Sequence, residues 1–315
     1  MERIVFLERN TFRVEFGRPS FPHEWCEFSE VTLDPVVELL NGASIAIINK
    51  LQLRSPELAQ LPRLKLIAVA ATGTDNVDLD YCREHGVAVC NVRDYAGNSV
   101  PEHVLMLILA LRRNLIAFSD DVLNGKWATA EQFCLLDHPI HDLAESTLGI
   151  VGHGFLGKSV AEKAAALGMK VLIAERKGAT NPRSGRLSFE DVLSLSDVVT
   201  LHTPLTAETE DLISKSELLS MKDNALLINT ARGGLVDETS LLRALQEGWI
   251  AGAAVDVLRE EPPRKGNVLL DVKLPNLIIT PHIAWASCEA MRSLGRQLIG
   301  NIEAFVRGEY VNRVV

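Results

Sequence analysis

The sequence predicts an α/β protein with two domains, each built around a parallel β-sheet. Three observations lead to this prediction. Short apolar runs alternate with helix-like stretches along most of the chain, which is the pattern of β-α-β units. A glycine-rich motif lies between one such run and a helix-like stretch in the second half of the chain. The chain has 315 residues, which is enough for two domains.

Composition and charge argue against several classes of protein. The chain is 47% apolar and 23% charged, as is usual for globular proteins. Its net charge of −9 argues against nucleic acid as a partner, because phosphate backbones require a basic surface. No apolar run is long enough to span a bilayer, and the charged segment 1–10 does not resemble a signal peptide. We therefore expect a cytoplasmic protein with no membrane contact.

The number and spacing of the cysteines are also typical of a cytoplasmic protein. There are five of them, no two form a C-x-x-C motif, and no group of histidines and cysteines has the spacing of zinc ligands. We expect reduced, mostly packed thiols and no metal site. The five are Cys26, Cys82, Cys90, Cys134 and Cys288.

Residues 1–97 are expected to form the first α/β unit. The helix candidates are the amphipathic stretches 34–40 and 79–84. This part of the chain carries no phosphate-binding fingerprint. The strand candidates are residues 4–7, 43–48, 64–69 and 87–90.

The loop 71–77, after the third of these strands, has two interpretations. Gly73 lies between Thr72 and Thr74 and would allow a row of backbone N–H groups to point outward as a nest for a small anion. Alternatively, this is a plain loop in which Asp75 caps the following helix. The residues alone favour neither interpretation.

A long helix is expected to begin close to Asn98. Ser99 is a suitable N-cap, Pro101 follows in the first turn, and Glu102 supplies an acid at the third position. The stretch 105–111 is apolar nearly all round, which predicts a buried helix that links the domains.

An irregular arm near residues 120–143 is expected to follow this helix. It contains Trp127, Phe133 and the two histidines His138 and His141. Exposed aromatic side chains on an arm are typical of a subunit contact. We therefore expect a homodimer.

The glycine-rich motif reads Gly152-His153-Gly154-Phe155-Leu156-Gly157. The apolar run 148–151 precedes it and the Ala-rich stretch 158–167 follows it, which is the strand–turn–helix context of a dinucleotide-binding fingerprint. In that fingerprint the first glycine permits a tight turn, the second lets a pyrophosphate approach the backbone, and the third lets helix and strand pack together. The N–H groups of the first helical turn would then hold the phosphates.

A carboxylate at the end of the next strand bears on the choice of coenzyme. The strand candidate 170–174 ends at Glu175, about 20 residues past the glycines, where the fingerprint places the acid that binds the ribose of NAD. A carboxylate there would repel the 2′-phosphate of NADP. Arg176 and Lys177 follow directly and would either bind that phosphate or remain solvated loop charges. We expect NAD, with NADP as the alternative through these two cations.

Polar residues follow each remaining strand of the second half, at the edge where open α/β sheets bind ligands. The strand candidates are 197–201, 225–229, 251–255 and 277–280, and a helix over 291–307 closes the chain. The residues after these strands are His202, Thr203 and Pro204, then Thr230, Ala231 and Arg232, then Asp256, and finally Pro281 and His282.

Three residues of this region have the chemistry needed to reduce a 2-keto acid, namely Arg232, Glu261 and His282. An arginine binds a carboxylate bidentately, and a histidine can protonate the developing alkoxide. A carboxylate orients the imidazole and stabilises its charge. Each residue alone has a plain explanation, as a solvated turn residue, a loop charge or a core histidine. Their occurrence together on one dinucleotide-binding sheet favours catalysis.

Four stretches resemble the signature motifs of the D-isomer-specific 2-hydroxyacid dehydrogenases. The resemblance covers essentially the whole chain. It implies two Rossmann-like domains with parallel sheets and the active site in the cleft between them. Residues 1–97 plus 287–315 would form the substrate-binding domain, and 98–286 the dinucleotide-binding domain with its dimerisation arm. The stretches are 229–238 (NTARGGLVDE), 252–257 (GAAVDV), 261–263 (EPP) and 276–284 (NLIITPHIA).

The resemblance also implies a role for each site residue. Arg232 would bind the substrate carboxylate and carbonyl, His282 would be the general acid/base, and Glu261 would pair with His282. Asp256 would hold the nicotinamide carboxamide. The loop Thr72-Gly73-Thr74 would cradle the substrate carboxylate with its backbone. Thr203, Pro204, Thr230 and Ala231 would line the cofactor.

Residues 71–76 (ATGTDN) and 281–286 (PHIAWA) most resemble the glycerate dehydrogenase/hydroxypyruvate reductase branch of the family. That branch implies reduction of hydroxypyruvate to D-glycerate, and of glyoxylate to glycolate. Formate dehydrogenases differ because they carry glutamine where Glu261 stands. Alternatives are a D-lactate or phosphoglycerate type of dehydrogenase, or a non-catalytic NAD(H)-sensing docking protein like the related corepressors. Trp285 would either cap the site or belong to the core.

Overall fold

The computed structural model describes residues 1–29 and 36–315. These residues form two compact units, Met1–Tyr95 with Ala286–Val315, and Ala96–Trp285. Both are α/β units with a parallel sheet, as predicted. Residues 34 and 35 of the predicted helix 34–40 lie outside the described residues, and helix α1 spans Val36–Leu39.

The first unit is built on a five-stranded parallel sheet in the order β2-β1-β3-β4-β5. Every residue of β3 and β4 is buried, because a strand covered on both faces is apolar along its whole length. The strands are β1 Glu2–Phe6, β2 His23–Glu27, β3 Ile45–Ile48, β4 Leu66–Val69 and β5 Ala88–Cys90. The helices are η1 Arg9–Thr11, α1, α2 Ser55–Leu58, α3 Leu79–Glu84 and α10 Cys288–Val306.

The second unit is built on a six-stranded parallel sheet in the order β11-β10-β9-β8-β6-β7. The order reverses at β6, since β7 lies on one side of it and β8 on the other. Open sheets bind ligands beyond the carboxyl ends of the strands at such a switch point. The strands are β6 Thr147–Val151, β7 Lys170–Ile173, β8 Val198–Leu201, β9 Leu226–Asn229, β10 Gly252–Val255 and β11 Leu277–Ile279.

Helix α4 packs against β9, β10 and α6 of the second unit. Its side chains Val104, Leu107 and Ile108 are at most 1% exposed, so this face is buried as predicted. The prediction of burial all round is wrong, because Met106 and Leu109 on the other face are 48% and 41% exposed. The helices of this unit are α4 Ser99–Arg112, α5 Leu115–Leu123, η2 Trp127–Thr129, α6 Phe155–Ala166, α7 Phe189–Leu195, α8 Lys215–Ser220, η3 Gly233–Leu235 and α9 Glu238–Glu247.

The start of α4 corrects one prediction. Ser99 is not the N-cap, because Asn98 occupies that position. The backbone of Asn98 is already close to helical, so Ser99 lies inside the first turn. Its hydroxyl donates to the carbonyl oxygen of Ala284 at 2.6 Å. Ser99 therefore ties α4 to the loop that follows β11.

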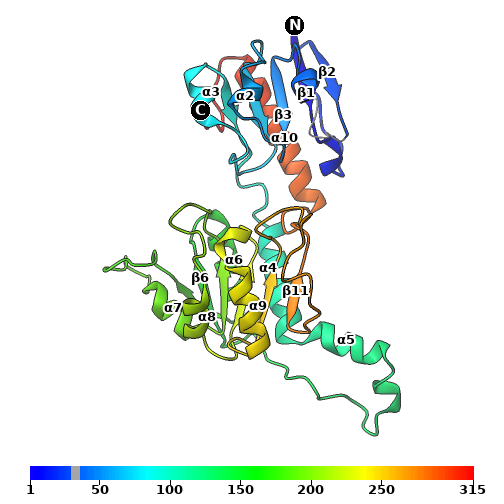
Figure 1. The fold of residues 1–315 in the computed structure, drawn as a ribbon, viewed down its shortest axis with the longest axis vertical. Coiled ribbons are helices and arrows are strands. Elements are labelled where there is room, and N and C mark those ends of the chain that lie inside the picture. Colours follow the sequence, from blue (N-terminus) through cyan, green and yellow to red (C-terminus); the bar gives the residue numbers. More distant parts are fainter. Residues whose placement is uncertain (30–35) are drawn as a thin grey trace. The chain divides into compact units, whose positions relative to one another are not determined.

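Helix α5 and the segment after it extend away from the sheet of their own unit (Figure 1). Apart from η2, residues 124–143 form no helix or strand, as predicted. Apolar side chains on this arm are exposed, among them Leu123, Trp127 and Phe133. Within the described part of the chain, no helix combines the length and apolarity needed to cross a bilayer.

Candidate active site

The glycine motif forms the tight connection from β6 to α6. Gly152 has a φ of 94°, and a Cβ on it would lie 2.6 Å from the carbonyl of His202. A Cβ on Gly157 would lie 2.1 Å from the carbonyl oxygen of Gly152. A Cβ on Gly154 would meet nothing within 4 Å. Packing therefore requires Gly152 and Gly157, whereas the backbone at Gly154 is open to an approaching ligand.

Two further observations fit a bound dinucleotide at this edge of the sheet. Helix α6 begins at Phe155, inside the motif, and its 12 residues give it a dipole and free N–H groups at that end. At the end of β9, Thr230 Oγ1 is buried and has no hydrogen-bond partner among the described residues. Buried hydroxyls are nearly always paired, so this atom suits a polar group of a ligand. Thr203 and Pro204, which follow β8, and Ala231, which follows β9, remain partly or fully exposed.

Glu175 lies just beyond β7, as the fingerprint predicted, and both of its oxygens already accept hydrogen bonds. The Arg183 guanidinium donates to them from Nε at 2.6 Å and from Nη2 at 2.5 Å. The backbone N–H groups of Arg176 and Arg183 donate at 2.9 and 3.2 Å. The Arg183 side chain and these N–H groups hold the pKa of the Glu175 carboxyl far below its usual range.

The cations around Glu175 are not the two that the sequence suggested. The Nζ atom of Lys177 lies 2.9 Å from Glu217 Oε1, on a different element. Arg176 reaches Glu175 through its backbone N–H. The side chains that approach the carboxylate belong to Arg183 and to Arg186, whose Nη1 lies 3.8 Å from Glu175 Oε1. Sequence reasoning missed both arginines because they come late in a loop without a motif.

His282 and Glu261 form a close acid–base pair. The Nδ1 atom of His282 lies 2.5 Å from Glu261 Oε2. The N–H of Leu258 donates to Glu261 Oε1 at 2.8 Å and fixes the carboxylate. The two side chains remain 25% and 30% exposed. Because Nδ1 faces the carboxylate, Nε2 is the ring nitrogen available for proton transfer.

Asp256 holds the loop that carries His282. Its buried carboxylate accepts hydrogen bonds from the Thr280 hydroxyl at 2.5 Å, the Ile283 N–H at 2.9 Å and the Ala284 N–H at 2.8 Å. Its backbone carbonyl accepts from the His282 N–H at 2.7 Å. These bonds keep His282 at a φ of 56°, a left-handed backbone conformation that costs a non-glycine residue about 1 kcal/mol or more.

Helix α4 braces the same loop through His103. The Nε2 atom of His103 lies 3.1 Å from Thr280 Oγ1 and 3.6 Å from Asp256 Oδ1. The Thr280 hydroxyl donates to the carboxylate, so its oxygen accepts from His103 and Nε2 carries the proton. Burial lowers the pKa of His103, and the charge of Asp256, which acts to raise it, does not outweigh the burial. The indole N–H of Trp285 also donates to the loop, to the His282 carbonyl at 3.0 Å.

Arg232 lies in the turn between β9 and η3. Its Nη1 donates to the Ala231 carbonyl at 2.7 Å, and its side chain is partly buried. A Cβ on Gly233 would lie 2.0 Å from the carbonyl carbon of Leu258. The Arg232 turn therefore packs directly against the segment that leads to Glu261. The structure thus places all three predicted catalytic residues on neighbouring loops, at the carboxyl ends of adjacent strands.

In the first unit, the loop after β4 is braced on both sides. The Thr72 hydroxyl donates to the Val92 carbonyl at 2.9 Å, and the Asn91 side chain donates to the Thr72 carbonyl at 2.7 Å. Asp78, and not Asp75, caps helix α3, because the Asp78 side chain accepts a backbone N–H of the first turn. The prediction that Asp75 caps this helix is therefore wrong, whereas the choice between a plain loop and an anion nest at residues 72–74 stays a prediction.

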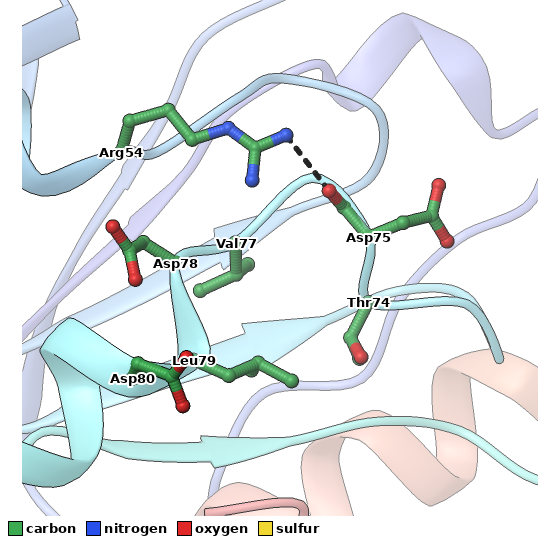
Figure 2. A pocket seen from close by; sticks show the side chains of 7 residues that line it. All are labelled: Arg54, Thr74, Asp75, Val77, Asp78, Leu79 and Asp80. Carbon is green, nitrogen blue, oxygen red and sulfur yellow. Dashed lines mark hydrogen bonds between the residues drawn. The ribbon is translucent and has the colours of Figure 1, made fainter. Parts of the chain in front are cut away.

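A surface hollow of about 580 Å³ lies beside this loop (Figure 2). Arg54 reaches across it and donates from Nη2 to the Asp75 carbonyl at 2.8 Å. Thr74 forms one wall, and Asp78 and Asp80 lie on the other side of the hollow. The nearby aspartates make the hollow itself unfavourable for an anion.

Comparison with known proteins identifies the family. Residues 105–284 match the family described as D-isomer specific 2-hydroxyacid dehydrogenase, NAD binding domain. The chain belongs to this family. It is therefore an NAD-binding oxidoreductase, and the resemblance, the fold class and the nicotinamide cofactor expected from the sequence are confirmed.

Individual relatives of this dehydrogenase match along most of its length. A glycerate dehydrogenase of Methylorubrum extorquens is 51% identical over 314 residues, which cover 99% of both chains. A glyoxylate reductase of Thermococcus litoralis is 37% identical over 260 residues, 80% of this chain and 77% of that protein. The solved structure of a D-lactate dehydrogenase from Aquifex aeolicus, complexed with NAD and lactic acid, has a TM-score of 0.79 at 28% identity and covers 97% of this chain and 96% of its own.

Proposed function

We propose that this dehydrogenase reduces hydroxypyruvate to D-glycerate, and glyoxylate to glycolate. The observation that carries the proposal is the acid–base pair of His282 and Glu261, with the Arg232 turn packed beside it. The glycerate dehydrogenase and glyoxylate reductase relatives supply the substrate class, which is short 2-keto acids.

His282 would move the proton. Its Nε2 donates a proton to the carbonyl oxygen of the substrate while C2 receives a hydride, which the reduced nicotinamide supplies when it is bound. Glu261 orients the ring through Nδ1 and balances the charge of its protonated form. The neutral ring left after the transfer takes up a proton from solvent. In the reverse direction the neutral Nε2 accepts the proton of the substrate hydroxyl.

Arg232 would bind the carboxylate and carbonyl of the substrate. A guanidinium has five N–H donors, so its bond to the Ala231 carbonyl leaves most of the fork for a carboxylate. We assign the first unit to substrate binding, with the backbone at Thr72, Gly73 and Thr74 as a cradle for the same carboxylate. The bonds of Asp256 to the His282 loop support a positioning role, beside its family role at the nicotinamide carboxamide.

We also propose that two copies of the chain pair through the arm formed by α5 and residues 124–143. Leu123, Trp127 and Phe133 on this arm are 80%, 53% and 90% exposed. Grouped apolar side chains of this kind mark interaction surfaces, and a second copy would cover them. Light scattering should give twice the monomer mass of 34.6 kDa. A Phe133→Asp variant should dissociate, and a wild-type mass equal to the monomer would contradict the proposal.

Turnover of several 2-keto acids tests the assignment. We expect kcat/KM with NADH to be highest for hydroxypyruvate, followed by glyoxylate, pyruvate and phosphohydroxypyruvate. His282→Ala should lower kcat by about 10²- to 10⁴-fold and leave NADH binding intact, because His282 acts on the proton and not on the coenzyme. A preference for pyruvate or for the phosphorylated acid would reassign the substrate. NADH binding without turnover of any acid would favour the docking-protein alternative.

A further inference from the structure

The loop after β4 directs two successive carbonyl groups toward one neighbouring segment of its own unit. The Ala71 carbonyl accepts from the Val92 N–H at 3.1 Å, and the Thr72 carbonyl accepts from Asn91 Nδ2 at 2.7 Å. In a planar trans peptide the N–H points in the direction opposite to the C=O. The N–H groups of Thr72 and Gly73 therefore point away from the donors at residues 91 and 92.

These two N–H groups can donate to a ligand. Among the described residues, neither of them has a hydrogen-bond acceptor. Two successive N–H groups that point to the same side form the concave arrangement in which backbone binds small anions. Thr72 is exposed and Gly73 is half-buried, so this part of the loop lies at the surface, and neither residue lines the acidic hollow beside it.

The side chain of Asn91 fixes the direction of the Thr72–Gly73 peptide. Its Oδ1 accepts from Arg93 Nε at 3.1 Å, and a guanidinium only donates, so Nδ2 is the atom that faces the Thr72 carbonyl. The backbone of Asn91 is bonded as well, because its N–H donates to the Asn312 carbonyl at 3.2 Å. Asn91 is 7% exposed, and a buried amide that is bonded on both sides has little freedom to turn.

Two more asparagines extend this network to the segment after α10. Asn301, on α10, is 3% exposed, and its Nδ2 donates to the Asn91 carbonyl at 2.8 Å. Its Oδ1 is thereby left to accept, and Asn312 Nδ2 donates to it at 3.0 Å. The segment of Asn312 is itself fixed beside β5, because the Val314 N–H donates to the Val89 carbonyl at 2.7 Å. A continuous chain of amide bonds therefore runs from this segment to the loop after β4.

We propose that Asn91, held by Asn301 and Asn312, is a positioning residue for substrate binding. It keeps the Gly73 N–H aimed at the carboxylate of the substrate and does not touch the substrate itself, because its amide is bonded on both sides. The inference rests on the proposed reduction of a 2-keto acid and on the proposed cradle. Without the Asn91 donor the Thr72 carbonyl would turn toward water, and the Gly73 N–H would turn with it, because the peptide rotates as one plane. The substrate would then lose a hydrogen bond to its charged group.

Two variants break the network without adding charge. Asn91→Leu removes the donor to Thr72, and Asn312→Gly removes the donor to Asn301 while it keeps the left-handed backbone at residue 312, where φ is 50°. We expect KM for hydroxypyruvate to rise at least about tenfold in Asn91→Leu and about threefold in Asn312→Gly. The value of kcat and the Kd of NADH should stay within about threefold of wild type, because the lost bond serves substrate binding. The double variant should lose no more than Asn91→Leu, since both changes act through the same peptide.

Controls separate positioning from a loss of stability. Ile45→Val removes a methyl group from the buried strand β3 of the same unit. Glu145→Gly makes a glycine substitution at another left-handed position, on an exposed residue before β6. Both should keep KM within about twofold of wild type. Glycolaldehyde, which is hydroxypyruvate without its carboxylate, is assayed at high enzyme concentration and should be reduced with the same kcat/KM by every folded variant.

Each contrary result has a distinct meaning. A KM for hydroxypyruvate that stays at the wild-type value in both Asn91→Leu and Asn312→Gly would overturn the positioning role and leave the proposed reaction standing. Equal losses with hydroxypyruvate and glycolaldehyde would also overturn it, because the network would then stabilise the fold alone. If Asn91→Leu does not fold, the same comparison in Asn312→Gly decides the question. A wild-type chain that reduces no 2-keto acid would refute the proposed function and this positioning role with it.

Discussion

Replacing Asp256 by asparagine tests whether the charge of this carboxylate holds the His282 loop in place. The substitution preserves shape but leaves one acceptor oxygen and adds an NH₂ group. In its best orientation the oxygen keeps the bonds from the Thr280 hydroxyl and the Ile283 N–H. The new NH₂ then faces the N–H of Ala284, which currently donates to the second carboxylate oxygen at 2.8 Å.

The cost follows from these bonds. A buried N–H left without an acceptor costs about 1–3 kcal/mol, and the two remaining bonds lose the extra strength that a charged acceptor gives. Because Asp256 is 1% exposed, water cannot replace the lost acceptor. We expect Asp256→Asn to lower the free energy of unfolding by about 3 kcal/mol. We also expect kcat to fall by about 100-fold, the effect of a shift of roughly 1 Å in a reacting group.

Urea unfolding and steady-state kinetics measure the two effects. The matched control is Asp80→Asn, since Asp80 is 88% exposed and its 2.6 Å bridge to Arg83 is on the surface. That control should change stability by less than about 0.5 kcal/mol and leave kcat unchanged. The reasoning fails if Asp256→Asn unfolds within about 0.5 kcal/mol of the wild type, or keeps a kcat within threefold of it.

Two further substitutions address the second unit. His103→Leu removes the donor to Thr280 and should lower kcat three- to tenfold with less effect on KM. His103→Gln, whose amide can donate, should keep most of the activity. Equal losses of activity in the two variants would contradict a positioning role for His103. Burial opposes the charge of Glu217, but hydrogen bonds from Ser214 and Lys177 outweigh it and lower its pKa to about 2 from 4.5. Because the folded-state pKa is the lower one, Glu217 contributes about 2 to 3 kcal/mol above pH 4.5, which is lost as the pH falls toward 2. Urea unfolding of Glu217→Gln should therefore differ from wild type at pH 7 and converge with it near pH 2, and a difference independent of pH would refute this account.

Most strands of the two sheets could be predicted, because parallel strands covered on both faces are apolar throughout. Every residue of β8, β9 and β10 is buried, and each of these strands lies within a predicted apolar run. Strand β2 was not predicted, because it is an edge strand that is only partly buried and has two glutamates among its five residues. Helix α5 was not predicted either, because its apolar side chains face outward and form no apolar stripe toward the core.

Part of the candidate site could likewise be predicted from the sequence, and part could not. The residues Arg232, Glu261 and His282 could be placed together from sequence, since the carboxyl ends of parallel strands meet at one edge. The contacts of His103 and Arg183 could not, because they depend on packing between elements far apart in the chain or on the path of a loop. His103 lies 177 residues from Thr280 and carries no motif of its own. For Arg183 the available signal was the excess of cations between residues 176 and 186.

One sheet carries both the glycine motif and the residues proposed for proton transfer. The glycine motif follows β6 and Glu175 follows β7, whereas Arg232, Asp256 and His282 follow β9, β10 and β11 at the other end of the strand order. Neighbouring strands lie about 4.8 Å apart, so the two groups are separated by a spacing that the hydrogen bonds of the sheet fix. A dinucleotide held by the glycine motif would extend along this edge of the sheet, from β7 toward β9 and β10. The residues proposed for coenzyme binding and those proposed for proton transfer are therefore different, and the strands between them hold the two groups at a fixed separation.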